Sequence, residues 1–244
     1  MLPASFCKEY DLDIRNFGKV LTLNNFMLAQ FINREDAGRR LAKVLSKYKG
    51  GDAVVCALPR GGVVTGYEIA RELKLPLDII SVRKIGHPMA PEYAIGAVLE
   101  DGEKILNETE AASVDPKWLK EEIASQKAEA LRRGAVYRPG GKMAKPLAVS
   151  GKTSIIVDDG VATGLTMRLA VTAMKARHPK KIVVAAPVAP AEAITALRKD
   201  GADEVVTLIP PEDFLGSVGA HYASFEQTKD DEVIRLMRLS QSQA

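Results

Sequence analysis

Residues 153–167 read Thr-Ser-Ile-Ile-Val-Asp-Asp-Gly-Val-Ala-Thr-Gly-Leu-Thr-Met, and this stretch decides the fold that the sequence predicts. The apolar, β-branched run at 153–157 predicts a buried strand. Two carboxylates, Asp158 and Asp159, follow at once, and a loop of small residues then enters a helix expected over 164–177. A buried strand, a short loop and a helix in immediate succession indicate an α/β protein.

The same alternation of strand and helix continues on both sides of this stretch. Further strands are expected at 53–58, 77–82, 181–186 and 204–208, and further helices after Asn33 and over 62–73 and 191–199. Short, continuously apolar strands separated by helices are typical of a parallel sheet that is covered on both faces. We therefore predict a doubly wound, mainly parallel sheet.

A long insertion interrupts this pattern after the second strand. Residues 86–112 contain two prolines and several glycines and are expected to be irregular and flexible, with a hairpin joining 95–99 to 103–106 around Asp101-Gly102. Asp115 as N-cap and a proline in the next position then open a helix that runs to about Arg133. A small C-terminal hood segment is expected after the last strand.

Composition excludes several classes of protein. The chain has 244 residues, 46% of them hydrophobic, and a net charge of +3, which predicts a globular protein rather than a disordered one. Its two cysteines, Cys7 and Cys56, cannot form a disulfide scaffold. No apolar stretch approaches the roughly 18 residues that span a bilayer, and no signal-peptide pattern is present, so we expect a cytoplasmic protein. Residues 1–26 are interpreted as an N-terminal extension and 27–244 as one domain.

The stretch after the strand at 153–157 has the chemistry of a sugar-phosphate site. The start of a helix offers unpaired N–H groups and positive dipole charge to a phosphate, and small residues let the backbone approach it. Two carboxylates beside a phosphate are better suited to hydroxyl groups or a cation. Neither a Gly-x-x-x-x-Gly-Lys-Ser/Thr loop nor a Gly-x-Gly-x-x-Gly loop occurs. An isolated Asp-Asp-Gly would more often be a simple turn, but its place between strand and helix favours a site.

Two more candidate places follow strands. Arg60, Gly61 and Gly62 come directly after the strand at 53–58, and glycine amides with an arginine suit a diphosphate. Arg83 and Lys84 end the strand expected at 77–82. Ligands of open α/β sheets bind beyond the carboxyl ends of the strands, where all three places are expected to meet. Taken singly, a glycine pair usually marks a turn and an Arg-Lys pair usually faces water.

Residues 155–167 resemble the thirteen-residue signature with which type I phosphoribosyltransferases bind 5-phosphoribosyl 1-diphosphate (PRPP). The resemblance implies that Asp158 and Asp159 contact the ribose hydroxyls. It implies that Gly160 belongs to the PRPP-binding residues and that the 5′-phosphate is enclosed by Ala162, Thr163, Gly164, Leu165 and Thr166. Arg60, Gly61 and Gly62 resemble the family's diphosphate loop, which often contains a non-proline cis peptide, with Arg60-Gly61 as the candidate bond. Arg83 and Lys84 match a further diphosphate contact of the family.

The family resemblance also implies an activity. The expected reaction is Mg²⁺-dependent transfer of the phosphoribosyl group of PRPP to a nitrogenous base or amine, with Asp158 and Asp159 helping to place the metal through ribose and diphosphate. Arg60 and Lys84 are the candidate catalytic cations, and Glu92, followed by His87, is the candidate proton acceptor. The most similar group consists of bacterial phosphoribosyltransferases of unassigned substrate, so the acceptor stays open.

The alternative is a PRPP-binding regulator without catalysis. Residues 127–152 hold seven basic groups and one acid, which could attract nucleic acid, although such a stretch more often flanks an anion site or faces water. Nucleic acid and membrane are therefore not expected as partners, and a homodimer is left open.

Aromatic residues after the last strand either stack on a base or pack in the core, and we favour packing: Phe214, His221, Tyr222 and Phe225.

Overall fold

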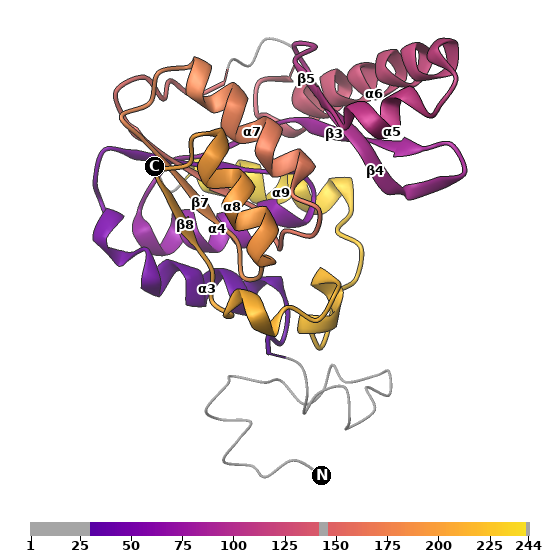
Figure 1. The fold of residues 1–244 in the computed structure, drawn as a ribbon. Helices are drawn as coiled ribbons and strands as arrows, with labels where there is room; N and C mark the ends of the chain where they lie inside the picture. Colours follow the sequence, from indigo (N-terminus) through magenta and orange to yellow (C-terminus); the bar gives the residue numbers. More distant parts are fainter. Residues whose placement is uncertain (1–29, 142–145, 243–244) are drawn as a thin grey trace.

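The computed structural model describes residues 30–141 and 146–242, except for the side chain of Glu92. Its centre is a sheet of five parallel strands in the order β2-β1-β6-β7-β8 (Figure 1). The strands are β1 (Ala53–Ala57), β2 (Leu77–Ile79), β6 (Thr153–Val157), β7 (Lys181–Ala185) and β8 (Glu204–Val206). The predicted doubly wound α/β fold is confirmed, and the expected extension at residues 1–26 lies outside the described residues.

Helices cover both faces of this sheet, which explains why its strands are apolar without alternation. On β1, Val55 and Ala57 pack into one core cluster, and Val54 and Cys56 pack into the other. The first cluster includes α3 (Arg34–Val44), α4 (Gly61–Leu73) and α9 (Asp230–Gln241), and the second includes α7 (Leu165–Ala176) and α8 (Ala191–Asp200). A short turn, η2 (Ser46–Tyr48), links α3 to β1.

The insertion forms an arm beside the central sheet, drawn in magenta in Figure 1. Three antiparallel strands pair in the order β3-β4-β5, and two helices follow them. These elements are β3 (Val82–His87), β4 (Ala90–Leu99), β5 (Lys104–Leu106), α5 (Glu108–Ala112) and α6 (Pro116–Tyr137). The hairpin around Asp101-Gly102 is confirmed. The expectation of an irregular segment over 86–112 is wrong, since β3 and β4 extend through much of it.

Local features explain why the sequence does not predict the pairing of β3 with the first part of β4. The β3–β4 ladder shifts register at Gly86, where a Cβ atom would overlap the carbonyl oxygen of Pro91. Pro91 lacks an N–H, but it lies on the part of β4 that β5 does not reach, because β5 pairs only with residues 96–98. Proline and glycine therefore occupy places where the ladder does not need a hydrogen bond or a side chain.

A buried arginine fastens the arm to the central sheet. Arg138, just after α6, donates to Asp78 Oδ1 on β2 at 3.1 Å and to Glu100 Oε1 after β4 at 2.9 Å. The same guanidinium also donates to the carbonyl oxygen of Ile79 at 3.0 Å. Its side chain is only 7% exposed. The three segments are thus joined through one charged group that water hardly reaches.

The C-terminal segment folds over the carboxyl edge of the sheet. Two 3-10 turns, η4 (Pro211–Asp213) and η5 (Val218–His221), follow β8. The chain then pairs with the residues before α3, with Phe31 N donating to the His221 carbonyl at 2.9 Å and Ala223 N donating to the Phe31 carbonyl at 2.8 Å. Among the described helices, none combines the length and apolar character that crossing a bilayer requires.

Candidate functional site

Two of the three predicted loops meet where the direction of the sheet reverses. From β1 the chain crosses through α4 to β2 on one side, and from β6 it crosses through α7 to β7 on the other. Since β1 and β6 are neighbours, their carboxyl ends open into one crevice, the usual ligand position of such sheets. The structure therefore brings the 60–62 loop against the 158–164 loop.

Glycines 61 and 62 allow this close approach. A Cβ atom on Gly62 would lie 2.9 Å from both Cα and Oδ1 of Asp158. A Cβ atom on Gly61 would overlap Asp159 Oδ2 and lie 2.8 Å from Nε of Arg34. Any larger residue would push the acidic pair out of place, so the glycine pair here is more than an ordinary turn.

The two carboxylates of the acidic pair have different environments. Asp159 Oδ2 accepts a hydrogen bond from Arg34 Nε at 2.6 Å. Asp158 Oδ1 accepts one from the backbone N–H of Asp159 at 2.9 Å. Burial and then the neighbouring charge of Asp159 raise the pKa of Asp158 well above its usual range. A cation or a hydroxyl donor placed beside Asp158 would relieve this unfavourable charge.

We expect Asp158→Asn to make the folded protein more stable at neutral pH. Because the pKa of Asp158 is raised in the folded state, the folded protein binds the proton of the Asp158 carboxyl group more tightly than the unfolded chain does. The contribution of Asp158 to stability is then present below the ordinary Asp range and is lost as pH rises toward the folded-state pKa. Asparagine carries no charge and removes this loss. Urea unfolding at about pH 5 and about pH 8 measures the difference. An equal or lower stability of Asp158→Asn at the higher pH, relative to an exposed Asp231→Asn control, would contradict it.

The 158–164 loop ends at an open helix start. Gly164 is the N-cap of α7 with a left-handed φ of 78°, and no side chain caps this helix. Ala162 and Thr163 are exposed just before it, whereas Leu165 and Thr166 form its first turn and are half-buried. The N-termini of α3, α5 and α6 are each capped by an Asn or Asp side chain, whereas α4, α8 and α9, like α7, have no side-chain cap. The first-turn amides of α7 are thus available to an anion.

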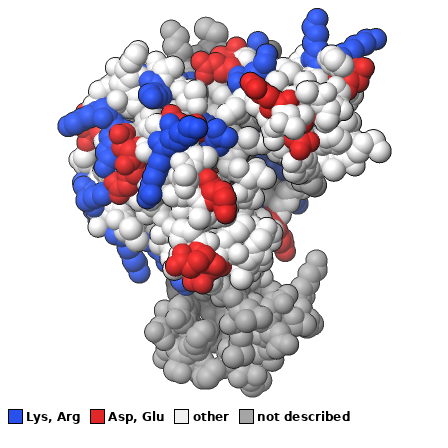
Figure 2. All heavy atoms as spheres, in the orientation of Figure 1, with Lys and Arg blue, Asp and Glu red and all other residues white. Residues whose placement is uncertain are grey.

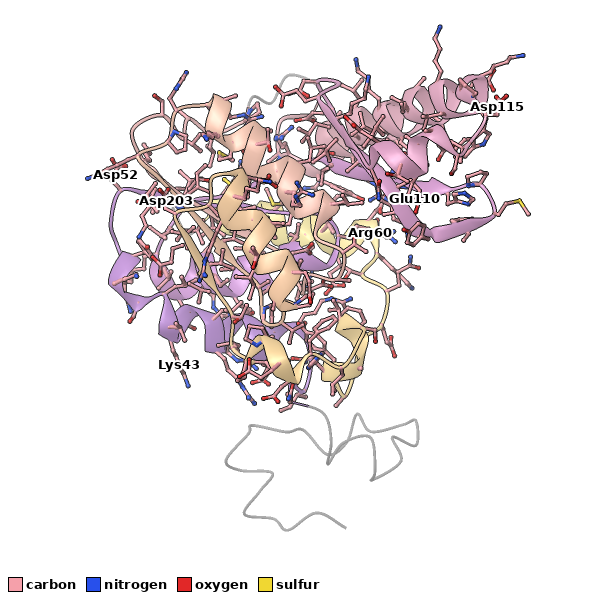
Figure 3. All side chains as sticks on the ribbon, viewed as in Figure 1. Lys43, Asp52, Arg60, Glu110, Asp115 and Asp203 are labelled. Carbon is pink, nitrogen blue, oxygen red and sulfur yellow. The ribbon has the colours of Figure 1, made fainter. Side chains whose placement is uncertain are left out.

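Arg60 lies at the start of α4, between the central sheet and the arm in Figure 3. The cis peptide bond joins Pro59 to Arg60. The expected position, Arg60-Gly61, is therefore wrong by one residue. Arg60 Nη1 lies 3.3 Å from Asp230 Oδ1, on the first residue of α9.

Arg83 and Lys84 were expected at the end of a strand of the central sheet, and this expectation is wrong. Strand β2 stops at Ile79, and both residues lie on β3 of the arm. Successive side chains of a strand leave opposite faces, so the two do not form one surface. Arg83 is half-buried, and its Nε donates to Gln126 Oε1 on α6 at 2.9 Å. Burial, followed by the positive charges of neighbouring arginines that include Arg60, lowers its pKa. The positive charges of Arg83 and Arg60 therefore repel each other, and an anion bound between them would relieve this repulsion.

The two candidate proton acceptors lie at or close to the turn of the β3–β4 hairpin. Glu92 is on β4, but its side chain lies outside the described residues. His87 Nδ1 accepts a hydrogen bond from Met89 N at 3.2 Å, and this contact shapes the turn between the strands. The structure thus gives His87 a local structural contact and leaves the role of Glu92 a prediction.

Two residues hold the acidic loop without having been predicted to do so: Arg34, and Tyr222, which the sequence indicated only as a packing residue of the hood segment. Arg34 at the start of α3 pairs with Asp159, donates to a backbone carbonyl at 2.7 Å and stacks 3.8 Å from the ring centroid of Phe225. Tyr222 O–H donates to the Asp159 carbonyl at 2.5 Å. Arg34 opens α3, Tyr222 lies well beyond the end of β8, and no local pattern distinguishes either as a site residue. Only the return of the C-terminal segment across residues 30–32 brings them to the site.

The aromatic side chains of the hood segment pack against one another. Tyr222 stacks on Phe225 with centroids 4.8 Å apart and contacts Phe31 at 5.3 Å. Phe214 stacks on His221 at 5.5 Å. These contacts favour the interpretation that the hood aromatics form a small core rather than a free platform for a base.

Most of the described basic residues of the stretch over 127–152 are paired with acidic side chains from the stretch itself or from other segments. Arg132 and Arg133 donate to Glu129 at 2.7 and 2.8 Å, and Arg138 is buried among acidic partners. On the face shown in Figure 2, acidic and basic side chains of the described residues are interspersed. Such mixing disfavours a nucleic-acid surface, which is normally dominated by positive charge.

Comparison with known proteins agrees with this geometry. The family described as "Phosphoribosyl transferase domain" matches residues 27–224. Two curated proteins of Mycobacterium tuberculosis, "Putative phosphoribosyl transferase MT0597" from strain CDC 1551 / Oshkosh and "Putative phosphoribosyl transferase Rv0571c" from strain H37Rv, are each 41% identical over 215 residues. The match covers 85% of this chain and 46% of each relative, so the chain spans about half the length of these curated relatives.

A solved structure is also similar over most of its length. The crystal structure of TT1426 from Thermus thermophilus is 40% identical, with a TM-score of 0.68, and the match covers 85% of this chain and 97% of that one. Together with the family match over residues 27–224, these relatives show that the chain belongs to the phosphoribosyltransferase family of transferase enzymes.

Proposed function

We propose that the protein transfers the 5-phosphoribosyl group of PRPP to a nitrogenous base or amine and releases diphosphate. The observation that carries this proposal is the contact between the 61–62 glycines and the Asp158–Asp159 pair at the reversal point of the sheet. A ligand in this crevice meets carboxylates in the middle, an open helix start on one side and Arg60 on the other. Phosphate, vicinal hydroxyls and diphosphate follow one another in the same order along PRPP.

Each end of the site has a distinct task in this reaction. The amides of the 160–166 loop and the first turn of α7 bind the 5′-phosphate. Asp158 and Asp159 accept hydrogen bonds from the ribose hydroxyls, and Arg34 holds the Asp159 carboxylate in place. Negative charge accumulates on the departing diphosphate, where Arg60, the glycine amides of the 61–62 turn and the nearby Arg83 stabilise it. Lys84 remains a further candidate cation, although its side chain leaves β3 on the face opposite to that of Arg83.

Magnesium is implied by the family, and the residues present fit it. Mg²⁺ is commonly bound by one or two carboxylates together with phosphate oxygens of the substrate. The described residues contain no group of three or more His, Cys, Asp or Glu side chains arranged for a metal ion. Asp158 and Asp159 are the pair that would help to hold Mg²⁺, with the remaining ligands from ribose and diphosphate oxygens. Bound there, the ion would neutralise charge on the leaving diphosphate.

We propose Glu92 as the group that accepts a proton from the acceptor base. In the β3–β4 hairpin it belongs to the arm that carries Arg83, whose pKa is lowered in part by the positive charge of Arg60. Glu92→Gln should lower the turnover number at saturating substrates by about 10²-fold or more, because general base catalysis contributes of that order. Steady-state kinetics of the variant test the assignment. An unchanged turnover number would remove Glu92 from the mechanism and leave His87 as the remaining candidate of the hairpin.

A screen of bases and amines with PRPP and Mg²⁺ tests the proposed function. Release of diphosphate in the presence of one acceptor, and not in its absence, is the expected result. Binding of PRPP without release for any acceptor would instead favour the regulatory alternative. Absence of PRPP binding with Mg²⁺ present would contradict both.

A further inference from the structure

A single carboxylate of α9 receives hydrogen bonds from three directions beside the crevice. Asp230 Oδ1 accepts from Tyr137 O–H at 2.7 Å and from Arg60 Nη1 at 3.3 Å, and Oδ2 accepts from Arg132 Nη2 at 3.2 Å. The donors come from the start of α4 and from the last turns of α6. Convergence of two guanidinium groups and a hydroxyl on both oxygens of an anion is the pattern by which proteins bind carboxylate and phosphate.

The surroundings of this carboxylate carry excess positive charge. Ion pairs connect Arg60, Asp230, Arg132, Glu129 and Arg133 in one chain. After burial, the positive charges of Arg133 and Arg60 also lower the pKa of Arg83. This chain of ion pairs holds three guanidinium groups and two carboxylates, so without Asp230 the cluster carries an excess of two positive charges. An anion with at least two negative charges would balance this cluster better than the Asp230 carboxylate does.

We propose that Asp230 occupies an anion subsite built by Arg60, Arg132 and Tyr137, and that the diphosphate of the ligand displaces it. This inference rests on the proposed function and deepens it, because it adds the end of α6 to the binding surface of the diphosphate. In the ligand-free protein the first turn of α9 covers the subsite. In the bound protein α9 gives up its contacts with Arg60, Arg132 and Tyr137.

The chemistry of the three donors permits this exchange. Asp230 is 34% exposed and Arg132 is 49% exposed, so their ion pair is screened by water and is readily broken. Tyr137 is buried and keeps its proton, since burial and then the bond to Asp230 raise its pKa to about 12. A phosphate oxygen would accept the same hydrogen bond. No donor is therefore left without a partner when the carboxylate leaves.

Titration calorimetry with inorganic diphosphate tests the subsite, because the proposal predicts whether each substitution raises or lowers the affinity for diphosphate. Removing the competing charge with Asp230→Asn should tighten binding by about fivefold, the size expected for partly exposed ion pairs. Tyr137→Phe should weaken binding by a similar factor, because it deletes one donor of the subsite. The matched control is Asp231→Asn on the adjacent, exposed acid of α9, which should leave the affinity unchanged.

A decrease or no change in the affinity of Asp230→Asn would overturn the subsite and make Asp230 a fixed cross-link that orients Arg60. Hydrogen exchange of the wild-type protein gives a second reading that needs no variant. Amides in the first turn of α9 should exchange faster once diphosphate is bound, and unchanged or slower exchange would also overturn the proposal. If PRPP binds but Asp230→Asn shows no gain, only the subsite fails. If diphosphate binds as expected but PRPP does not, only the proposed function fails.

Discussion

Replacing Arg138 with Met is expected to lower the free energy of unfolding by about 3–5 kcal/mol, the usual cost of removing one partner from a buried ion pair. The guanidinium is 7% exposed and bonds both Asp78 and Glu100, whose side chains are 8% and 18% exposed. Methionine fills much of the same volume but leaves both carboxylates without their cation. Urea denaturation of the wild type and the variant measures the difference.

Two further variants distinguish the loss of the buried ion pairs of Arg138 from a general effect of mutation on stability. The triple variant Arg138→Met, Asp78→Asn, Glu100→Gln should recover part of the loss, since it removes the stranded charges as well. Arg238→Ala, at an exposed position of α9, should change stability by no more than about 0.5 kcal/mol. A loss below about 1 kcal/mol for Arg138→Met would mean that the arm is not fastened to the sheet through this network.

Arg60→Ala is expected to reduce the rate of diphosphate release by about two powers of ten. Arg60 is the cation next to the 61–62 glycine turn, and loss of one charged donor from developing negative charge costs about 3 kcal/mol in the transition state. The side chain is 25% exposed and forms its ion pair with the carboxylate of Asp230, so its removal is not expected to unfold the protein. Steady-state kinetics with PRPP and the acceptor identified by screening give the ratio of kcat/KM.

Arg39→Ala is the matched control for this variant. Arg39 is an arginine on α3 that is 46% exposed and lies 4.0 Å from its partner Glu68. It should retain the wild-type rate, because it belongs to the outer surface of α3 and touches neither candidate loop. A rate for Arg60→Ala within about threefold of the wild type would exclude Arg60 from stabilising the leaving group.

Much of the central sheet could be predicted because its information is local. Each parallel strand is a short apolar run, and each turn into a helix contains glycine or a polar residue within a few positions. The meeting of the 60–62 and 158–164 loops also follows, since neighbouring parallel strands end at one edge. These rules need no knowledge of side-chain contacts.

The contacts that complete the site could not be predicted, because they join distant segments. Arg34 and Asp159 are 125 positions apart, and Arg60 and Asp230 are 170 positions apart. Pairing over such separations depends on how the C-terminal segment returns across the sheet. The part of β4 before residue 95 was missed for a different reason: Pro91 and the neighbouring glycines normally indicate a loop, and only the register shift beside β3 accommodates them.

Calorimetric titration of PRPP with Mg²⁺ present tests the central claim, that the Asp158–Asp159 pair and the glycine turn form one phosphoribosyl site. The wild-type protein should bind PRPP, and the double variant Asp158→Asn, Asp159→Asn should lose this binding while its circular dichroism spectrum stays unchanged. Absence of binding by the wild type, or equal binding by the folded double variant, would contradict the account.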